Sequence, residues 1–386
     1  MKICLINNLY KPFNRGGAEK ITETIANGLI KAGHEVFIIT TKPNKGLRVA
    51  GCGLRAYYLN SFYYNLNKLP KFLRLFWQIW NMFNFVSYYK IKNILQIEKY
   101  DAVITNNLMG VGFLTPLAIR NLKIKHLHIA HDIQLIHPSG LMYCAKERII
   151  DSFFAKVYSS VCRYLFASPP AVVFPSRWLK ELYIKRKFFR QSKIYVLPNP
   201  VEATPAQASK PAGNFKFLFL GQIEKHKGVF LLINAFNKIK EKYPEVELIL
   251  AGGGSKIEEA RRKAKGNKNI KFLGWLGDEA ADKLLFSSNC LVYPSLVYEN
   301  CPNAIQRAIV VGLPVLASNL GGIAELLTGG AGMLFKPADS DDLTEKMAWM
   351  IENNGSLNDL TEAGRQKISA FMVENYIKEL EEMIKL

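Results

Sequence analysis

Two series of short apolar runs, each alternating with helical patterns, constrain the fold of this chain most strongly. The runs are rich in Val, Ile and Leu, and the segments between them repeat apolar residues with the period of an amphipathic helix. Parallel strands need such crossover helices, so the alternation predicts parallel α/β units. In the first half the expected strands are Ile3–Asn7, Glu35–Thr40, Ala102–Thr105, Lys125–Ala130, Ala171–Phe174 and Lys193–Leu197. In the second half they are Phe215–Leu220, Val246–Ala251, Ile270–Leu273, Cys290–Tyr293 and Pro314–Ala317.

A segment dense in Pro, Ala, Ser and Gly, residues 198–213, separates the two series. Such a composition is typical of a linker between domains. With 386 residues, the chain is long enough to build two cores. We therefore predict two doubly wound domains over residues 1–200 and 214–367, a linker over 201–213 and a final helix within 368–386. Two such domains would face each other across a cleft, and ligands of doubly wound sheets bind beyond the carboxyl ends of the strands.

Composition argues against a membrane-spanning, secreted or zinc-binding protein. No apolar run reaches the ~18 residues that are needed to cross a bilayer. The chain enters a strand-like run at once, from Lys2 to Asn8, and we expect no signal peptide there because this run is too short and too poorly flanked. The six cysteines show no C-x-x-C pattern and no regular spacing, as expected for reduced thiols in a cytoplasmic protein. We expect no metal site and no tightly bound cofactor.

The positive charge of the chain is confined to its first half. Residues 1–200 carry 29 Lys and Arg against 9 Asp and Glu, whereas residues 201–386 carry 22 against 23. A basic surface that only favours solubility would be spread over both halves. The asymmetry therefore favours a first domain that faces an anionic partner. A nucleic-acid partner is not expected, because no recognised nucleic-acid motif occurs.

Glycine-rich loops follow strands and precede helices in both halves. Gly16 and Gly17 precede a helix that runs to about Lys31. Glycines let the backbone approach a phosphate at a helix N-terminus, although a paired glycine can equally form a simple turn. In the second half, the loop Gly221–Gly228 places Lys227 just before a helix, where the helix dipole disfavours a cation. A bound diphosphate would compensate for that charge, whereas a solvated lysine would need no ligand.

The most informative stretch is YPSLVYENCPNAIQRAIVVGLPVLAS, which begins at Tyr293. A strand ends at Pro294, Glu299 stands in the following loop, and a helix is expected to begin near Pro302, a residue favoured at the first helical position. Glu299 should therefore point into the cleft just ahead of a helix N-terminus. A carboxylate there can accept hydrogen bonds from two sugar hydroxyls while backbone amides bind phosphate.

Taken together, these motifs resemble the GT-B glycosyltransferases of the large retaining family 4, the glycosyltransferase group 1 proteins. The resemblance spans nearly the whole chain and depends on the order and spacing of its motifs. They are Gly-Gly-Ala-Glu near the start, His131-Asp132, Gly-Gln-Ile-x-x-His-Lys-Gly from Gly221, Tyr-Pro-Ser…Glu299…Gly-Leu-Pro-Val, and Ser-Asn-Leu-Gly-Gly-Ile-Ala-Glu from Ser318. The resemblance implies two Rossmann-like domains, the first on the acceptor side and the second binding the nucleotide-sugar donor. It also implies that the closing helix, about Ser369–Lys385, packs back on the first domain.

The resemblance implies a role for each matching residue. Gly16 and Gly17 would bring backbone amides to the donor diphosphate. Lys227 would neutralise the leaving group, which is the electrostatic help that a departing nucleotide needs in the absence of a tightly held metal. Glu299 would hold hydroxyls of the donor sugar, and His131 would contact that sugar at the reacting centre.

We therefore expect Glu299, His131 and Lys227 to be the catalytic residues. The expected donor-binding residues are Gly16, Gly17, Gln222, Lys227, Glu299, Asn300, Asn303 and Arg307.

Two of these positions depart from the family pattern. The family usually has an arginine where Gln222 stands, and it has a second glutamate, which binds the ribose, where Arg307 stands. A guanidinium only donates hydrogen bonds, and no Asp or Glu occurs between Asn300 and Ala324 to replace the carboxylate. The loss should weaken donor binding by about 2–4 kcal/mol. Three explanations remain open: a donor held differently, with Arg307 pairing with a phosphate; an enzyme of low affinity; or an inactive relative.

Other conspicuous groups are expected to be structural. His131 and Asp132 are adjacent on an extended strand, so their side chains point apart and do not form a base with its orienting acid. His126 and His128 are expected to pack in the interior. Asp339 resembles the start of a metal motif, but it precedes an amphipathic helix and is better explained as an N-terminal cap.

Two segments of the first half mix aromatic and basic residues. In residues 68–90 a narrow polar stripe, which includes Arg74, Gln78 and Asn81, runs along an otherwise apolar helix. That helix either packs on the first sheet or lies in a lipid surface with Trp77 and Trp80. Residues 177–193 contain seven cations among aromatic residues and could also contact an anionic leaflet.

These patterns predict a retaining hexosyltransferase that moves a sugar from a UDP or GDP donor to a glycan or membrane-linked lipid acceptor. We expect it in the cytoplasm, on the inner face of the plasma membrane, in the synthesis of cell-envelope polysaccharide. The alternative is an inactive GT-B scaffold or binding protein, because Arg307 replaces the ribose-binding glutamate.

Overall fold

The computed structural model describes residues 1–13, 16–43, 55–202, 213–368 and 371–385. The chain forms two compact units. Unit 1 consists of Met1–Leu141, Arg148–Pro200 and Val373–Leu386, and unit 2 consists of Met142–Glu147 and Val201–Met372. Most of the predicted linker, residues 203–212, lies outside the described residues.

Unit 1 is built on a seven-stranded parallel sheet with the order β3-β2-β1-β4-β5-β6-β7. The order reverses between β1 and β4, which is the switch point at which doubly wound sheets bind ligands. The strands are β1 (Lys2–Ile6), β2 (Glu35–Pro43), β3 (Arg55–Ser61), β4 (Ala102–Thr105), β5 (Lys125–Ile129), β6 (Ala171–Phe174) and β7 (Lys193–Val196).

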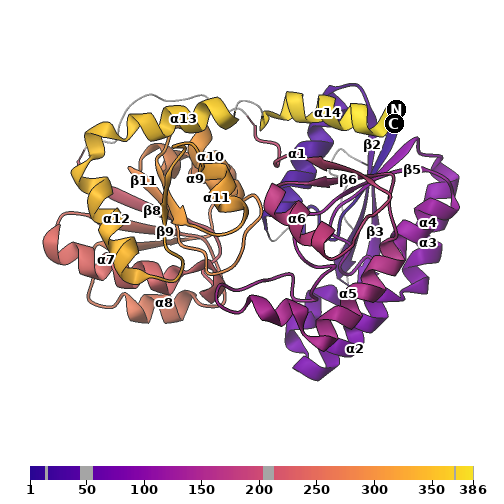
Figure 1. The fold of residues 1–386 in the computed structure, drawn as a ribbon, viewed down its shortest axis with the longest axis horizontal. Coiled ribbons are helices and arrows are strands. Elements are labelled where there is room, and N and C mark those ends of the chain that lie inside the picture. Colours follow the sequence, from indigo (N-terminus) through magenta and orange to yellow (C-terminus); the bar gives the residue numbers. More distant parts are fainter. Residues whose placement is uncertain (14–15, 44–54, 203–212, 369–370, 386) are drawn as a thin grey trace. The chain divides into compact units, whose positions relative to one another are not determined.

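Helices cover both faces of this sheet (Figure 1). On one face, α1 (Gly17–Lys31) and the last helix, α14 (Val373–Lys385), share a core with alternate residues of the strands. On the other face, α5 (Phe153–Phe166) packs Phe166 against His128 of β5, with ring centroids 5.2 Å apart. The remaining helices of this unit are η1 (Phe62–Lys68), α2 (Lys71–Met82), α3 (Phe85–Glu98), α4 (Thr115–Asn121) and α6 (Arg177–Lys185), with η2 (Glu147–Asp151) beginning at the last residue of a unit 2 segment.

Unit 2 repeats the plan with a six-stranded parallel sheet in the order β10-β9-β8-β11-β12-β13. Its switch point lies between β8 and β11. The strands are β8 (Lys216–Leu220), β9 (Glu247–Ala251), β10 (Ile270–Gly274), β11 (Cys290–Tyr293), β12 (Val315–Ser318) and β13 (Met333–Phe335).

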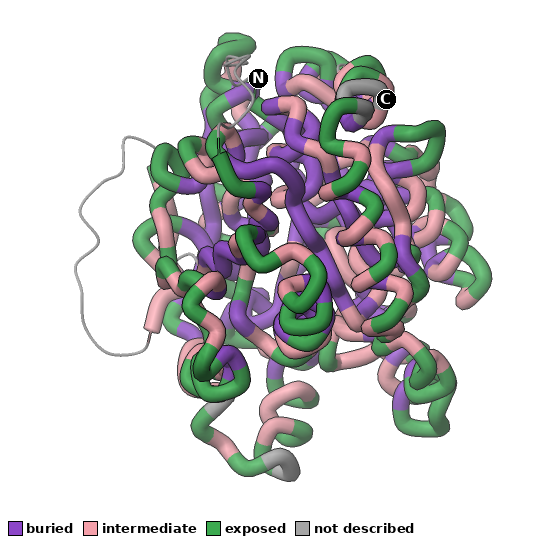
Figure 2. Tube along the Cα trace, turned by 90° about the vertical axis from the view of Figure 1, so that its left-hand side faces the viewer, coloured by how far each residue is buried: buried purple, intermediate pink, exposed green. Residues whose placement is uncertain are grey.

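Two hydrophobic cores hold the helices of unit 2 against opposite faces of its sheet. One core contains residues of α7 (Val229–Lys242), α8 (Ile257–Lys263) and α12 (Ser340–Glu352). The other contains residues of α9 (Asp278–Phe286), α10 (Asn303–Val310), α11 (Gly322–Leu327) and α13 (Asn358–Ile368). Figure 2 shows the central strands as buried tube and most of the exposed residues on outer helices and loops. Two short 3-10 helices, η3 (Lys225–Lys227) and η4 (Asn354–Ser356), also belong to this unit.

The structure confirms the predicted class of fold and all eleven expected strands, and adds β3 and β13. The final helix begins at Val373, and Ser369, where it was expected to begin, lies outside the described residues. Along the described residues, no helix is both long enough and apolar enough to span a bilayer.

The helix expected in residues 68–90 is α2 followed by α3, and its polar stripe lies on an unexpected side. Asn81 is buried, and its side chain accepts a hydrogen bond from Gly110 N at 2.7 Å. Phe76 and Trp80 are instead 65 % and 60 % exposed. The interpretation of α2 as a helix whose apolar side packs on the sheet is therefore wrong.

Candidate active site

Three glycines allow the loops at the carboxyl edge of the unit 2 sheet to pack closely together. Gly228, at the end of η3, has a φ of +76°, and a Cβ atom there would lie 1.7 Å from the carbonyl oxygen of Pro294. A Cβ atom on Gly252 would lie 1.8 Å from Gly221 O, and one on Gly254 would lie 2.4 Å from Ile223 O. Larger residues cannot occupy these positions without moving the backbone. The loops after β8, β9 and β11 therefore meet at the switch point of this sheet.

This packing brings Lys227 and Glu299 together. Lys227 Nζ lies 2.6 Å from Glu299 Oε1, and both side chains are mostly buried, with exposed fractions of 19 % and 17 %. The same ammonium lies 3.4 Å from the hydroxyl of Tyr293, at the end of β11. Ser295 Oγ also donates to Glu299 Oε1, at 3.2 Å. A cation from the β8 loop and an anion from the β11 loop thus form one polar centre, although 72 residues separate them in the chain.

The lysine remains charged in this centre. Burial alone would lower the pKa of Lys227, but the charge of Glu299 and the contacts with Tyr293 outweigh burial and raise the pKa above its ordinary value. Burial and the neighbouring charge of Lys227 lower the pKa of His226, so this histidine is neutral at pH 7. The centre therefore presents one positive and one negative group side by side.

The loop that carries Glu299 is fixed from two directions. Gly322 N donates to Glu299 O at 2.8 Å, and a Cβ atom on Gly322 would lie 1.6 Å from Asn300 O. From the other side, the short segment Met142–Glu147 of unit 2 pairs with the same loop through a bridge between Tyr143 and Val297. Sequence reasoning missed this segment, since nothing in its composition marks a partner more than 150 residues away.

The other expected donor-binding residues of unit 2 lie around the same loops. Asn300 is buried, and Asn303 is the first residue of α10, with Pro302 as its N-cap instead of its first helical residue. Gln222 follows β8, is exposed, and its carbonyl accepts a hydrogen bond from Glu224 N at 2.9 Å.

Arg307 points from α10 to α9. Its guanidinium contacts Asp282 Oδ1 at 2.6 Å, Asp278 Oδ1 at 3.3 Å and Asp278 O at 3.0 Å. The acidic residues near position 307 therefore come from a different helix, and sequence reasoning, which searched only between residues 300 and 324, missed them. Asp278 and Asp282 are one helical turn apart on α9, which is the one available sequence signal that they share a face.

Polar side chains also gather at the switch point of unit 1. His131 follows β5, and its Nε2 lies 2.9 Å from Oδ1 of Asn106, which follows β4. Asn107 N donates to Oδ1 of Asn7, at the end of β1, at 3.2 Å, and Asn8 N donates to Asn107 O at 2.8 Å. The asparagine pairs after β1 and β4 were not predicted, although polar residues that directly follow buried strands are a readable signal.

Burial sets the charge of His131 and its neighbour. It lowers the pKa of His131 to about 4 and raises the pKa of Asp132 to about 6, where a hydrogen bond from Gln134 N opposes the effect of burial. His131 is therefore neutral at pH 7, and its bond to Asn106 fixes its orientation. Gly16 is the N-cap of α1 and Gly17 its first residue, so both lie at a helix N-terminus close to β1. Asn14 and Arg15 of the same loop lie outside the described residues.

The groups expected to be structural have internal partners. His126 Nε2 and His128 Nδ1 lie 2.8 and 2.9 Å from the hydroxyl of Thr105, and both histidines are buried. Asp339 accepts hydrogen bonds from the backbone of Asp341 and Asp342 and caps α12, as predicted. Within the described ranges, no three His, Cys, Asp or Glu side chains come together as metal ligands.

Comparison with known proteins gives the same result for both halves of the chain. Residues 15–204 match the family model for glycosyltransferase family 4, and residues 200–367 match the one for glycosyl transferases group 1. An uncharacterized 42.6 kDa protein in the cps region of Klebsiella pneumoniae is 26 % identical over 84 % of this chain and 87 % of its own length. The phosphatidylinositol N-acetylglucosaminyltransferase gpi3 subunit of Schizosaccharomyces pombe is 24 % identical over 87 % of this chain and 70 % of its own length. HepE of Anabaena, solved in complex with UDP, has a TM-score of 0.73 and 18 % identity over the full length of both chains.

Two doubly wound parallel sheets, each with its own switch point, define a fold of the GT-B class. The matches along both halves place it further: the chain belongs to glycosyltransferase family 4, the group 1 glycosyltransferases.

Proposed function

We propose that this glycosyltransferase moves a hexose from a nucleoside diphosphate to a membrane-linked glycan or lipid acceptor, with retention of the anomeric configuration. The observation that carries the proposal is the buried pair of Lys227 and Glu299 at the switch point of unit 2. A departing diphosphate is stabilised by a cation beside its oxygens, and the hydroxyls of the donor sugar need a group that accepts their hydrogen bonds. The pair supplies both within 2.6 Å of each other.

In this proposal Lys227 shifts from Glu299 towards the diphosphate when the donor binds, and Glu299 is then free to accept sugar hydroxyls. Gln222, Asn300 and the N-terminus of α10 at Asn303 contribute further polar contacts to the donor. In unit 1, the neutral His131 contacts the donor sugar, and Gly16 and Gly17 bring helix N-terminal amides to the phosphates.

Arg307 has a different role in this proposal from the ribose-binding glutamate of the family pattern. Its guanidinium is engaged by Asp278 and Asp282, so it holds α9 against α10. We propose that the enzyme is active and that donor affinity comes chiefly from the diphosphate and the sugar. The complex of HepE with UDP supports a uridine nucleotide as the first donor to test, with GDP donors as the alternative.

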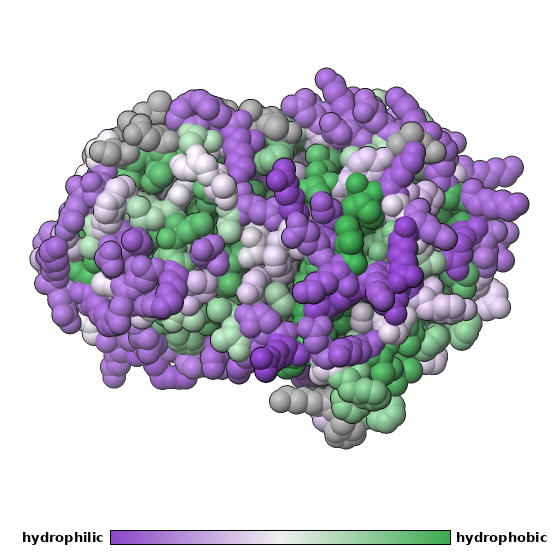
Figure 3. All heavy atoms as spheres, viewed as in Figure 1, coloured by the Kyte–Doolittle hydropathy of each residue, from purple (hydrophilic) through white to green (hydrophobic). Residues whose placement is uncertain are grey.

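Membrane contact is proposed from α2 and from charge. Its outward residues Leu75, Phe76, Ile79 and Trp80 are 49–65 % exposed, and residues 1–200 carry an excess of 20 positive charges. The region of α2 stands out as hydrophobic at the lower edge of unit 1 in Figure 3. Three of the four aromatic residues of the second basic segment, Tyr183, Phe188 and Phe189, are buried, so these rings do not enter a lipid surface. The phosphatidylinositol N-acetylglucosaminyltransferase supports a lipid acceptor, and the relative from a cps region supports a role in envelope polysaccharide. We place the enzyme in this proposal in the cytoplasm, on the inner face of the plasma membrane.

The test is a panel of UDP-, GDP-, ADP- and dTDP-sugars, with binding measured by calorimetry and hydrolysis by nucleotide release. We expect one donor to bind and to be hydrolysed slowly by the wild type. Glu299→Gln should abolish hydrolysis while it leaves binding of the free nucleoside diphosphate unchanged or up to ~10-fold tighter, because Lys227 loses its competing anion. Failure of the wild type to bind any donor would favour the inactive scaffold. The anomeric configuration of the product, determined by NMR, tests retention.

A further inference from the structure

Helix α5 exposes an apolar stripe that the sequence did not reveal. Its inward face consists of Ala155, Ser159, Cys162, Leu165 and Phe166. On the outward face, Phe153, Phe154, Val157 and Tyr164 are 75 %, 80 %, 49 % and 81 % exposed. At about 100° per residue, these four side chains fall within one arc of roughly 100°. A helix on a water-facing surface normally carries polar residues there, so the stripe indicates a non-aqueous partner.

Cations lie along one edge of this stripe and at its end. Lys156 and Arg163 lie on the same side of the stripe, about 60–80° around the helix axis from Phe153. Arg163 is held in place, because its guanidinium donates to Arg186 O at 2.9 Å and to Ser160 Oγ at 3.3 Å. An amphipathic arrangement of aromatic residues flanked by Lys and Arg is typical of helices in the headgroup region of a lipid leaflet.

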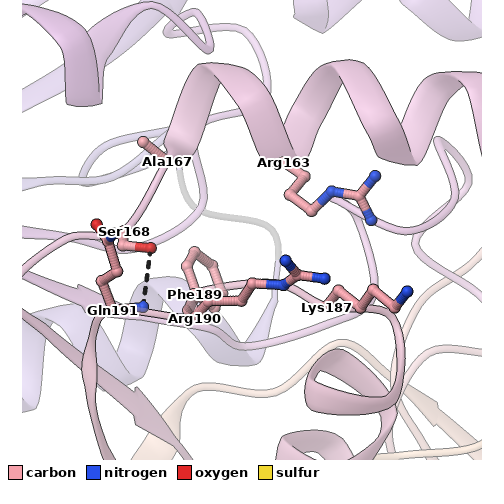
Figure 4. A pocket seen from close by; sticks show the side chains of 7 residues that line it. All are labelled: Arg163, Ala167, Ser168, Lys187, Phe189, Arg190 and Gln191. Atoms are coloured by element: carbon pink, nitrogen blue, oxygen red, sulfur yellow. Dashed lines mark hydrogen bonds between the residues drawn. The ribbon is translucent and has the colours of Figure 1, made fainter.

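A hollow of about 460 Å³ opens at the C-terminal end of α5. Its charged lining side chains are all cations: Arg163 from α5, and Lys187 and Arg190 from the segment between α6 and β7. Figure 4 shows the guanidinium groups of Arg163 and Arg190 turned towards the same space, with Lys187 alongside. Ser168 and Gln191 add polar groups, and Gln191 N donates to Ser168 Oγ at 3.3 Å. Such a lining fits a phosphate group.

The cationic segment is held firmly by its aromatic neighbours. Phe188 and Phe189, which stand between Lys187 and Arg190, are buried, and Phe189 stacks on Tyr183 with ring centroids 5.8 Å apart. Lys187 and Phe189 both adopt left-handed backbone conformations, with φ values of 63° and 54°. Non-glycine residues in this region are strained and persist where the surrounding structure fixes them, commonly at ligand sites.

The hollow lies away from the catalytic edge of the sheet. Ser168 precedes β6 and Gln191 precedes β7, so these residues stand at the amino edge. His131 and Asn106 follow β5 and β4 and stand at the carboxyl edge. A phosphate in the hollow is therefore not the reacting diphosphate of the donor.

We propose that α5 docks unit 1 on an anionic lipid surface, with the apolar stripe in the headgroup layer and a lipid phosphate in the Arg163–Lys187–Arg190 hollow. The inference deepens the membrane contact of the proposed function and rests on it. It adds a defined headgroup site, which α2 alone does not provide. The positive charge of residues 1–200 favours the same anionic surface.

Sedimentation of the full chain with vesicles tests the inference. The vesicles are pure phosphatidylcholine, or phosphatidylcholine with 30 % phosphatidylglycerol as the anionic probe (about one lipid in three). We expect the wild type to bind the anionic vesicles at least ~10-fold more tightly. Phe153→Ser/Phe154→Ser should weaken binding to both, and Lys187→Glu/Arg190→Glu should remove the preference for anionic vesicles. The milder pair Lys187→Asn/Arg190→Gln, in which Asn suits the left-handed backbone of position 187, should do the same to a smaller degree.

Matched controls separate this inference from the function on which it rests. Lys265→Glu/Lys268→Glu makes the same change in net charge on exposed residues of unit 2 and should leave vesicle binding unchanged. Phe76→Ser/Trp80→Ser tests α2: if it abolishes binding while the α5 and hollow variants bind like the wild type, membrane contact stands and the α5 site is overturned. If the wild type hydrolyses no donor in an assay without vesicles, that result instead contradicts the proposed activity. If inorganic phosphate binds in the hollow and the wild type shows no preference for anionic vesicles, the ligand of the hollow is a soluble anion and the proposal is overturned.

Discussion

At the scale of single residues, the polar centre of unit 2 depends on the ion pair between Lys227 and Glu299, in which each side chain stabilises the other. Burial alone would lower the pKa of Lys227, and the charge of Glu299 raises it instead, while Glu299 is held in place by Lys227 and Ser295. The separate residues could be selected from the sequence because each stands in a loop after a strand. Their direct contact could not, because it depends on Gly228 having no side chain against Pro294.

Replacing Lys227 by Met should weaken binding of the nucleoside diphosphate by about 10- to 100-fold, since one charge-assisted hydrogen bond in a buried site is lost. Calorimetric titration with UDP and GDP measures the effect. The control is Lys225→Met, which removes a neighbouring but exposed cation. Equal affinities in the Lys227 variant and the wild type would exclude Lys227 from the diphosphate site.

At the scale of elements, the contact between α9 and α10 depends on Arg307. Its two carboxylate partners come from α9. Arg307 and Asp282 are 30 % and 28 % exposed and Asp278 is 61 % exposed, so the pairs should contribute about 1 kcal/mol together. Substitution by Glu would place three carboxylates near one another.

We therefore expect Arg307→Glu to lower the free energy of unfolding by more than Arg307→Gln does, by about 1 kcal/mol or more. Urea unfolding measures the difference. The combination of Arg307→Glu with Asp282→Arg reverses the pair and should recover most of the loss. If the reversed pair is no more stable than Arg307→Glu alone, the ion pair does not hold the helices together.

Strand β5 carries a pH-dependent contribution to stability. Burial lowers the pKa of His126 and of His128 to about 3. Both histidines are neutral in the folded chain and take up protons on unfolding below pH 6.5. Their stabilisation is therefore present above pH 6.5 and is lost as the pH falls.

As the pH falls from 7.5 to 5.5, each buried histidine should lower the free energy of unfolding by about 1 kcal/mol. His126→Gln/His128→Asn should thus show a pH dependence smaller by about 2 kcal/mol, measured by urea unfolding at both values. Asp132, whose raised pKa of about 6 acts in the opposite direction at acid pH, is common to both proteins. Parallel pH profiles for the two proteins would contradict the burial of neutral histidines.

At the scale of the whole molecule, the architecture could be predicted further than its surfaces. The alternation of strands and helices sufficed for two doubly wound sheets, because periodicity reports burial directly. The edge strands β3 and β13 were missed: β13 has three residues, too few for a pattern, and β3 carries polar residues beside its aromatic ones. For α2 the sequence left open whether the apolar face meets the sheet or a lipid surface, and for α5 it gave no indication of an outward apolar face. Periodicity shows that a helix has two faces but not which of them meets the protein.

The last helix is part of the first unit, and its docking can be disrupted from the opposite end of the chain. A Cβ atom on Gly28 of α1 would lie 2.7 Å from a side-chain carbon of Ile377 on α14. Gly28→Leu should therefore displace α14 and lower the stability of unit 1 by about 2–3 kcal/mol. Hydrogen exchange measured by mass spectrometry should be faster in unit 1 and unchanged in unit 2. Gly33→Leu cannot serve as a control, because Gly33 has a φ of +86° that a leucine would not adopt. Ala32→Leu, at the exposed end of α1, is a better control.

The place of α14 has a consequence for the order in which the protein is made. Strands β1 to β7 leave the ribosome first, yet Val373, Tyr376, Ile377 and Leu380 complete the core over α1. During synthesis of the whole second unit, that face of the nascent first unit lacks its apolar cover. The earlier-made unit thus matures last, and its exposed core must be kept from aggregating until residues 373–385 emerge.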